Sequence, residues 1–492
     1  MSRIRRWALL AALGAAGVLP AGAEPVAVES AAPGRFALAP SGAHFVAADG
    51  RPVLWLADTW WFCPSALCAI DGSSATGIPS MFRALVDLRA SQGFNVIQMA
   101  FLGGAPRGGA GVLGLYRGQS SAAARRDYWA EIRKYIRYAN DKGLVAAIGL
   151  GFQRGLDDIT TEQLLAAWRD AVEALGDLQV VWFIAGEYNV QSTPERVAKV
   201  AAVGAALREI DGGRHPVTVH QADWTRRELS VGDPDWLDFV MVQGGHRELP
   251  PASLYAPRRR ADGGVKPVVE SECRYEGIQG LAGAAVSADD TRMCMIRAIQ
   301  AGAVGFSYGA HGLWYPVQSA GDQRFPDYGP ARPWWEAMKF PGAEAVGRVR
   351  RFYEAIEWWK WESRPGAAWT AERGGDGGGP VTRVMGNDRW LVWFPRGLAP
   401  RALVNARDLP AGSRYTLAWI PGHLRDTAPR PAGALAADGR NTLLPDRPSA
   451  EDWFLLMEKI PPVCDDAGVL PAEPAAPCRP SLPPSADTSL PP

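Results

Sequence analysis

Short apolar runs alternate with helix-type stretches along most of the chain. Residues 36–53 alternate apolar and polar positions around Ala48-Asp49-Gly50, a pattern typical of a β-hairpin. Eight nearly continuous apolar runs follow, each short enough to be a buried strand. The predicted strands are Val53–Ala57, Asn95–Ala100, Val145–Leu150, Val180–Ala185, Pro216–His220, Phe239–Gln243, Val268–Glu272 and Val304–Tyr308.

The segments between these strands predict helices. Strands that are apolar throughout and separated by helices are typical of a parallel sheet covered on both faces. We therefore expect an α/β fold, a (β/α)₈ TIM barrel, with only short helices after the fifth and sixth strands. An open doubly wound sheet is the alternative, but no G-x-G-x-x-G follows the first strand. The clearest helices are Tyr128–Lys142, Glu162–Leu175, Pro194–Ile210 and Asp289–Ala301.

The pattern changes near Pro365. A Gly-rich break at Gly374–Gly379 precedes short strand-like runs separated by turn residues, which predict a small C-terminal β-sandwich. Beyond Ile460 the chain is rich in Pro, Ala and Ser, which predicts a disordered tail. We expect the barrel with its hairpin in 24–364, the sandwich in 365–460 and the tail in 461–492. The sandwich runs are Thr382–Met385, Trp390–Trp393, Ala402–Val404, Thr416–Ile420 and Trp453–Met457.

The first residues have the form of an export signal. Three arginines precede the apolar run Trp7–Leu19, and Ala21-Gly22-Ala23 fits the small-x-small cleavage rule. The run is shorter than the ~20 residues that span a bilayer, and no Cys follows it as a lipid anchor would require. We predict a signal peptide in 1–23, no stable membrane anchor, and export to the periplasm or the medium.

The amino-acid composition limits the classes of molecule that the chain is expected to bind. The chain has 492 residues, a formal net charge of zero and no basic block, which argues against nucleic acid. Its 20 Trp residues suit a carbohydrate partner, because sugar C–H groups pack on aromatic faces, although most Trp fill cores. Nothing indicates a cofactor, and a monomer is favoured.

Six cysteines in an exported chain indicate disulfides. The sequence does not fix their pairing. A zinc site is disfavoured, because no C-x-x-C pair or His cluster accompanies them. The candidate pairs are Cys63 with Cys68, Cys464 with Cys478, and Cys273 with Cys294.

Polar residues gather at the carboxyl ends of the predicted strands, where barrel sites form. Seven at one rim are more than core packing alone requires. They are Asp58, Gln98, Glu187, His220, Gln243, Glu272 and, just past the last strand, His311.

Glu187 and Glu272 are the carboxylates that end the fourth and seventh strands. Glycoside hydrolysis needs such a pair, one as acid and one to attack or stabilise the anomeric carbon. A retaining pair is ~5–5.5 Å apart and an inverting pair ~6.5–9.5 Å. The alternative role of each glutamate is a salt bridge with a nearby base, and Arg274 is a candidate partner for one of them.

Two further glutamates lie close by in the sequence. Glu270 precedes Glu272 by two residues, so strand alternation predicts the same face at greater depth. We expect Glu270 to be a buried partner that is hydrogen-bonded or raised in pKa. Glu276 lies in the following loop and could bind substrate or Arg274.

Several segments resemble the apiosidase-type glycoside hydrolases (glycoside hydrolase family 140), exported barrels whose C-terminal β-sandwich is labelled collagen-binding. The resemblance implies that Glu187 is the acid/base and Glu272 the nucleophile. The chain has Ala185-Gly186-Glu187 where the family has Gly-Gly-Asp, and Cys273 where it has Pro, so the resemblance does not identify the sugar. The matching segments are Leu56–Trp60, Gly93–Gln98, Gly186–Asn189, Trp236–Phe239, Gln243–His246, Lys266–Val268, Glu272–Glu276, Ala301–Ala303 and Tyr308–His311.

The chemistry of the remaining residues suggests supporting roles. Asp58, Gln98, His220, Gln243 and His311 could hold sugar hydroxyls. In the same way, His246 and Tyr308 could orient the nucleophile, because an imidazole or phenol tunes a nearby carboxylate. Trp60 and Trp314 are candidates for a stacking platform, and Asn189 completes the supporting set.

The sequence therefore predicts an exported enzyme that cleaves a plant or bacterial polysaccharide or oligosaccharide. A carbohydrate-binding barrel without turnover is the alternative. A collagen-binding or proteolytic protein is disfavoured, because neither H-E-x-x-H nor G-x-S-x-G occurs. A metal-dependent hydrolase is disfavoured too, because no H-x-H follows the first strand.

Overall fold

The structure is a computed structural model. The predicted export signal, most of the Gly-rich break, and the pair Cys464 and Cys478 lie outside the described residues. The residues described are 36–71, 77–106, 111–118, 120–222, 229–259, 264–279, 283–320, 322, 324–370, 379–398, 402–405 and 408–461.

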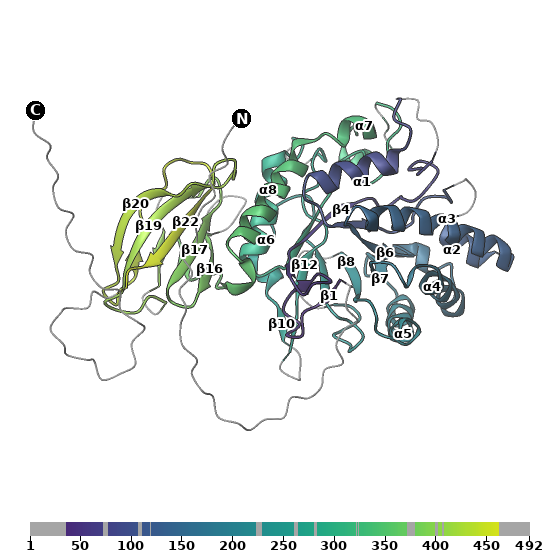
Figure 1. Cartoon of the computed structure of the whole chain (residues 1–492), viewed down its shortest axis with the longest axis horizontal. Helices are drawn as coiled ribbons and strands as arrows, with labels where there is room; N and C mark the ends of the chain where they lie inside the picture. Colours follow the sequence, from purple (N-terminus) through teal and green to yellow (C-terminus); the bar gives the residue numbers. More distant parts are fainter. Residues whose placement is uncertain are drawn as a thin grey trace, which may run out of the picture.

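Eight parallel strands close into a barrel, which confirms the predicted fold class (Figure 1). Nearly all of their side chains are buried, as expected of strands covered on both faces. All eight predicted strands overlap the observed ones. Around the barrel these are β4 (Trp55–Thr59), β5 (Val96–Met99), β6 (Val145–Gly149), β7 (Val180–Gly186), β8 (Val217–Ala222), β9 (Val240–Gln243), β12 (Val268–Glu270) and β13 (Gly305–Tyr308).

The first barrel strand begins two residues later than predicted. Pro52–Val53 forms β3 of a separate small sheet, so β4 runs from Trp55 to Thr59. Asp58 therefore lies within the strand, opposite Tyr308 on β13, and not beyond its end.

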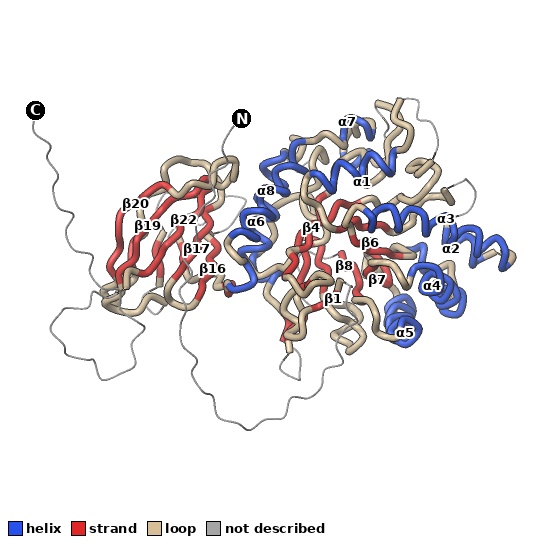
Figure 2. The backbone as a smooth tube through the Cα atoms, in the orientation of Figure 1, coloured by secondary structure: helices blue, strands red, loops and turns tan. Residues whose placement is uncertain are grey.

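Helices cover the outside of the barrel (Figure 2). The first turns of α4 and α6 are closed by capping boxes, Thr160 with Gln163 and Ser287 with Asp290. Between β9 and β12 the described residues form only the 3₁₀ turn η2 (Ala252–Tyr255) and the hairpin β10 (Arg258–Arg259) and β11 (Val265–Lys266). The α-helices are α1 (Met81–Ser91), α2 (Val112–Arg117), α3 (Ala122–Asp141), α4 (Thr161–Leu175), α5 (Pro194–Asp211), α6 (Ala288–Gln300), α7 (Trp334–Ala337) and α8 (Pro341–Ala355).

The N-terminal sheet closes one end of the barrel. Its strands are β1 (Ala37–Leu38), β2 (Phe45–Val46) and β3. Phe45 packs against Trp55 and Phe239, with ring centroids 5.4 and 5.0 Å away. Because Trp55 and Phe239 stand at the amino ends of their strands, this aromatic cluster leaves the carboxyl ends free for a site.

Two antiparallel sheets follow the barrel, as the predicted sandwich requires (Figure 1). The strand β20 (Arg430–Ala436) was not predicted, because it contains Pro and Gly and no β-branched residue. The larger sheet contains β14 (Glu362–Ser363), β16 (Val381–Met385), β17 (Arg389–Phe394), β22 (Trp453–Lys459), β19 (Arg414–Pro421) and β20, and the smaller one β15 (Ala368–Trp369), β18 (Leu403–Val404) and β21 (Thr442–Leu443).

Helix α6 connects the barrel to these sheets. Arg292 on α6 forms two hydrogen bonds of 2.7 and 2.8 Å with Asp452, and both side chains are almost fully buried. At the end of the same helix, Gln300 donates to the carbonyls of Val381 and Leu391. The helix therefore contacts the sandwich on one side and the barrel on the other.

Disulfides join Cys63 to Cys68 and Cys273 to Cys294, which confirms two of the candidate pairs. Within the described part of the chain, no helix has both the length and the apolar character needed to cross a membrane.

Candidate active site

A cavity of about 320 Å³ lies at the carboxyl ends of the barrel strands. Glu187, directly after β7, and Glu272, two residues after β12, both line it. Most of the other wall residues are aromatic, and the polar ones are few, as is usual for a small-molecule site. The wall also contains Trp61, Phe62, Leu102, Phe152, Gln153, Arg154, Gly155, His246, Tyr275, Ile278, Trp314, Phe325 and Tyr328.

The backbone of Glu187 has an unusual conformation, with a φ of 46°. Two hydrogen bonds hold it: its N–H donates to the His220 carbonyl at 2.7 Å, and its carbonyl accepts from Val190 at 3.0 Å. A left-handed residue other than Gly costs about 1 kcal/mol or more and persists only where the surroundings fix it. The preceding residue must be Gly186, because a Cβ there would lie 1.8 Å from the ring of Phe152.

Two side-chain amides hold the carboxylate of Glu187. Gln153, which also has a positive φ, donates to Oε2, and Gln243 donates to Oε1 at 2.8 Å. Burial raises the pKa of Glu187, and the nearby charge of Glu272 raises it further. The imidazole of His220 and the two amides oppose this rise, because they stabilise the ionised form.

Two imidazoles surround the carboxylate of Glu272. Nε2 of His246 lies 3.0 Å from Oε1, and Nε2 of His220 lies 3.4 Å from Oε2. Burial acts to raise the pKa of Glu272, but the two histidines outweigh it and hold the pKa at about 2. The two glutamates therefore differ: Glu272 is held as a carboxylate, while Glu187 keeps a proton to higher pH.

The two carboxylates face one another. One oxygen of Glu187, one oxygen of Glu272 and one ring nitrogen of His220 all lie within 4.8 Å of each other. In the residues that the structure describes, this is also the single group of His, Cys, Asp or Glu side chains placed to hold a metal ion.

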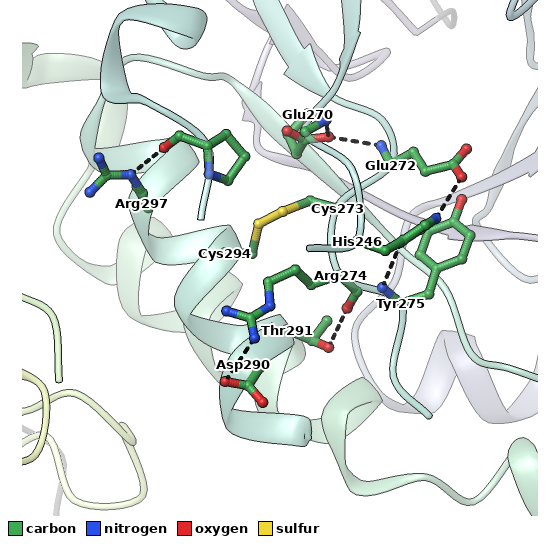
Figure 3. The surroundings of a disulfide bond; sticks show 12 residues. His246, Glu270, Glu272, Cys273, Arg274, Tyr275, Asp290, Thr291, Cys294 and Arg297 are labelled. Atoms are coloured by element: carbon green, nitrogen blue, oxygen red, sulfur yellow. Dashed lines mark hydrogen bonds and ion pairs between the residues drawn. A yellow bond between two sulfur atoms is a disulfide. The ribbon is translucent and has the colours of Figure 1, made fainter. Parts of the chain in front are cut away.

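Glu270 lies beside the backbone of Glu272, as Figure 3 shows. Its carboxylate accepts from the N–H groups of Glu272 at 2.8 Å and Gly244 at 3.0 Å, and from the Tyr255 hydroxyl at 2.6 Å. Burial raises the pKa of Glu270 to about 7. Glu270 is thus a buried, hydrogen-bonded partner, but its side chain does not share a face with that of Glu272. Strand β12 ends at Glu270, so the alternation does not continue to Glu272.

Helix α6 fixes the residues that follow Glu272 (Figure 3). The disulfide ties Cys273 to Cys294, and the carbonyl of Arg274 accepts from the Thr291 hydroxyl at 2.6 Å. The Arg274 guanidinium lies 3.3 Å from Asp290 and pairs with neither catalytic candidate. The position of Glu272 therefore depends on the placement of α6.

Several predicted substrate contacts lie outside the cavity. Asp58 forms a 2.6 Å ion pair with Arg89, and both side chains are fully buried. Trp60 is fully buried against Phe82. In each case the side chain serves the core, because it contacts a residue of helix α1 on the outside of the barrel and does not reach the cavity.

The other predicted site residues that lie outside the cavity have hydrogen-bond partners of their own. Gln98 donates to the Ser271 carbonyl and accepts from Ser307, and Tyr308 donates to Glu276 at 2.7 Å. Glu276 also accepts from the N–H of Gly342. It does not line the cavity that contains Glu187 and Glu272, and it does not pair with Arg274. The His311 ring lies 2.9 Å from the carbonyl of Gly329.

The structure does bring together six predicted residues. Five of them contact one another in a chain: Gln243, Glu187, His220, Glu272 and His246. The sixth, Trp314, lines the cavity that contains Glu187 and Glu272. Asn189 supports the rim, because its side chain bonds both the N–H and the carbonyl of Ala222.

The sequence interpretation missed much of the cavity wall. Trp61, next to the predicted Trp60, lies 5.0 Å from Phe152 and 5.2 Å from His220 between ring centroids. Phe152 and Gln153 come two and three residues after the third predicted strand, so their position near a strand end could have indicated them. Tyr275 lay within a matching segment, but Tyr328 ends the 3₁₀ turn η3 (Pro326–Tyr328), whose sequence has no distinguishing pattern.

Comparison with known proteins agrees with this architecture. Residues 39–360 match the family model described as "Apiosidase-like, catalytic domain". A solved structure named "Glycoside hydrolase" has a TM-score of 0.65 at 19% identity, covering 86% of this chain and 97% of its own. A glycoside hydrolase family 5 protein from Bacteroides vulgatus ATCC 8482 has a TM-score of 0.65 at 17% identity, covering 86% and 94%. A search of curated protein sequences finds no significant match.

Proposed function

The chain belongs to the apiosidase-like family through its catalytic domain, and we propose on this premise that it is a retaining glycoside hydrolase. In the proposal Glu187 is the acid/base and Glu272 the nucleophile. The observation that carries it is the approach of their carboxylate oxygens to within 4.8 Å. Retaining enzymes separate the two carboxyl groups by ~5–5.5 Å, whereas inverting enzymes need ~6.5–9.5 Å to admit a water.

The electrostatics of the pair support these roles. A nucleophile must be ionised, and the two histidines hold the pKa of Glu272 at about 2. An acid must keep its proton, and burial together with the charge of Glu272 raises the pKa of Glu187. Two carboxyl groups whose environments separate their pKa values are the usual mark of such an assignment.

In the first step the Glu272 carboxylate attacks the anomeric carbon. The glycosidic bond breaks, its electron pair goes to the leaving oxygen, and Glu187 gives that oxygen its proton. In the second step the Glu187 carboxylate takes a proton from water, and the water oxygen displaces Glu272 from the anomeric carbon. Two displacements at one carbon leave the sugar with its starting configuration.

The substrate in this proposal is a plant or bacterial oligosaccharide or polysaccharide. Trp61, Trp314 and Phe325 line the cavity and offer aromatic faces on which sugar C–H groups can pack. We assign the enzyme to the family 140 type and to the exported proteins. The two disulfides support export, because such bonds persist in oxidising compartments.

The test is hydrolysis of a panel of oligosaccharides and aryl glycosides, followed by proton NMR of the anomeric signal during the first turnovers. We expect a product with the configuration of its substrate. An inverted product would exclude the covalent route. Binding without release of sugar across the panel would instead support a carbohydrate-binding barrel.

A second prediction concerns Gln153. Its amide stabilises the charged form of Glu187, so Gln153→Ala should raise the pKa of Glu187 further. Activity requires the protonated acid, and the alkaline limb of the kcat–pH profile should therefore move to higher pH. Gln318→Ala, an exposed glutamine outside the cavity, should leave that limb in place. A limb that stays or moves to lower pH would show that another group controls it.

A further inference from the structure

Glu187, His220 and Glu272 form a cluster in which hydrogen bonds fix the positions of the histidine hydrogens. His220 is fully buried and Glu272 is 6% exposed, so water contributes little to their hydrogen bonding. Nε2 of His220 lies 3.4 Å from Oε2 of Glu272, and neither atom has a hydrogen-bond partner among the described residues. These two buried polar atoms face one another.

The tautomer of His220 follows from Ser271. The Ser271 hydroxyl donates its single hydrogen to the carbonyl of Val242 at 2.9 Å. Its oxygen can then only accept from Nδ1 of His220, which lies 2.8 Å away. Nδ1 therefore carries a hydrogen, and in the neutral ring Nε2 is an acceptor.

His246 has the opposite tautomer. Its Nδ1 accepts from the N–H of Tyr275 at 3.3 Å, so the hydrogen is on Nε2 and is donated to Oε1 of Glu272. One oxygen of Glu272 is thus satisfied. The other lies 3.4 Å from Nε2 of His220, and a positive species must lie between these two acceptors: a proton, which makes His220 the charged donor to Glu272, or a metal ion in its place.

The spacing of these atoms suits a small tetrahedral cation. Two ligand atoms each about 2.1 Å from a tetrahedral zinc ion lie about 3.4 Å apart, as the nitrogen and oxygen do here. Glu187 offers a third ligand atom within 4.8 Å. A ligating His usually donates its other N–H to a fixed acceptor, the role that Ser271 fills.

We propose that this cluster is an inhibitory site for one divalent transition-metal ion of the zinc class. The ligands are Nε2 of His220, Oε2 of Glu272 and a carboxylate oxygen of Glu187. An imidazole with two carboxylates favours zinc over magnesium or calcium, which prefer oxygen ligands alone. The ion takes the two carboxylates that the substrate needs, so metal and substrate exclude one another.

Binding is measured first and without substrate. The chelator-treated full chain is titrated with ZnCl₂ by calorimetry, with MgCl₂ as the comparison, and Co²⁺ serves as a spectroscopic probe. We expect one Zn²⁺ per chain, no Mg²⁺ heat at the same concentrations, and the strong visible absorption of four-coordinate Co²⁺. No zinc heat and no such spectrum at millimolar metal would overturn the proposal.

Variants locate the ion. His220→Gln and Glu272→Gln should each weaken Zn²⁺ binding by about 100-fold or more, beyond the 10–100-fold that loss of an outer-sphere partner costs. His423→Gln, which removes an exposed imidazole on the sandwich, should bind zinc like the wild type. If His220→Gln fails to fold, Glu272→Gln decides alone. Zinc affinity that survives in both folded variants would place the ion elsewhere.

Inhibition rests on the proposed hydrolase function, whereas binding does not. Zn²⁺ should raise the apparent KM without lowering kcat, and a chelator should restore the original KM. Activation by zinc would overturn the inhibitory role. Stoichiometric zinc binding by a protein that releases no sugar would contradict the hydrolase proposal alone.

Discussion

Glu272→Gln should abolish turnover while the protein stays folded. We expect kcat to fall by at least ~10⁴-fold, since removal of a covalent nucleophile costs about 10⁶-fold in another hydrolase. The amide has the shape of the carboxylate and can still accept from His246 through the atom that replaces Oε1. What it loses is the charge that attacks the anomeric carbon. Steady-state rates on an aryl glycoside, with thermal unfolding beside them, measure both effects.

The matched control is Glu248→Gln. It makes the same chemical change on an exposed residue of the loop after β9, outside the cavity. This variant should keep wild-type kcat and KM. Turnover by Glu272→Gln within tenfold of the wild type would mean that the nucleophile is another group, and the assignment of Glu187 would then also need revision.

Most of the barrel could be predicted because its strands are apolar on both faces. Such runs are visible in one sequence without knowledge of their partners, as Val180–Gly186 illustrates. Strand β20 could not be found in this way. Its residues have little intrinsic preference for a strand, and pairing with β19 forms it.

Site residues could be predicted only where their position at the end of a strand determines whether they reach the cavity. Glu187 and Glu272 follow apolar strands and reach the cavity. Asp58 has a similar sequence context, but a fully buried arginine 31 residues away pairs with it. No local pattern reveals such a partner.

The direction of the neighbouring side chains depends on backbone geometry. Trp60 and Trp61 are adjacent and chemically identical, yet only Trp61 lines the cavity, because a turn follows β4 at this point. Gln153 reaches Glu187 from a residue with a φ of 42°. A positive φ at a residue other than Gly arises from tertiary contacts, so local sequence does not predict it.

Glu187→Ala should give a defect that depends on the leaving group. With a poorly activated glycoside, kcat/KM should fall by about 10²–10⁴-fold, the usual contribution of a general acid. With a dinitrophenyl leaving group, which needs no proton, the first step should stay fast. The glycosyl–enzyme should then accumulate, because no base activates the water, and a burst of phenolate should precede slow turnover. Stopped-flow absorbance measures the burst.

Azide separates a lost acid/base from a damaged site. The small anion needs no deprotonation, so it should restore turnover of the activated substrate and yield a glycosyl azide of unchanged configuration. The hydrogen bonds that Glu187 makes to His220 and Val190 come from its backbone, so the variant keeps them. Glu195→Ala, the same change at an exposed position in the first turn of α5, should behave as the wild type and show no azide effect. An equal loss on good and poor leaving groups would assign Glu187 to substrate binding, because a binding contact does not distinguish how easily the bond breaks.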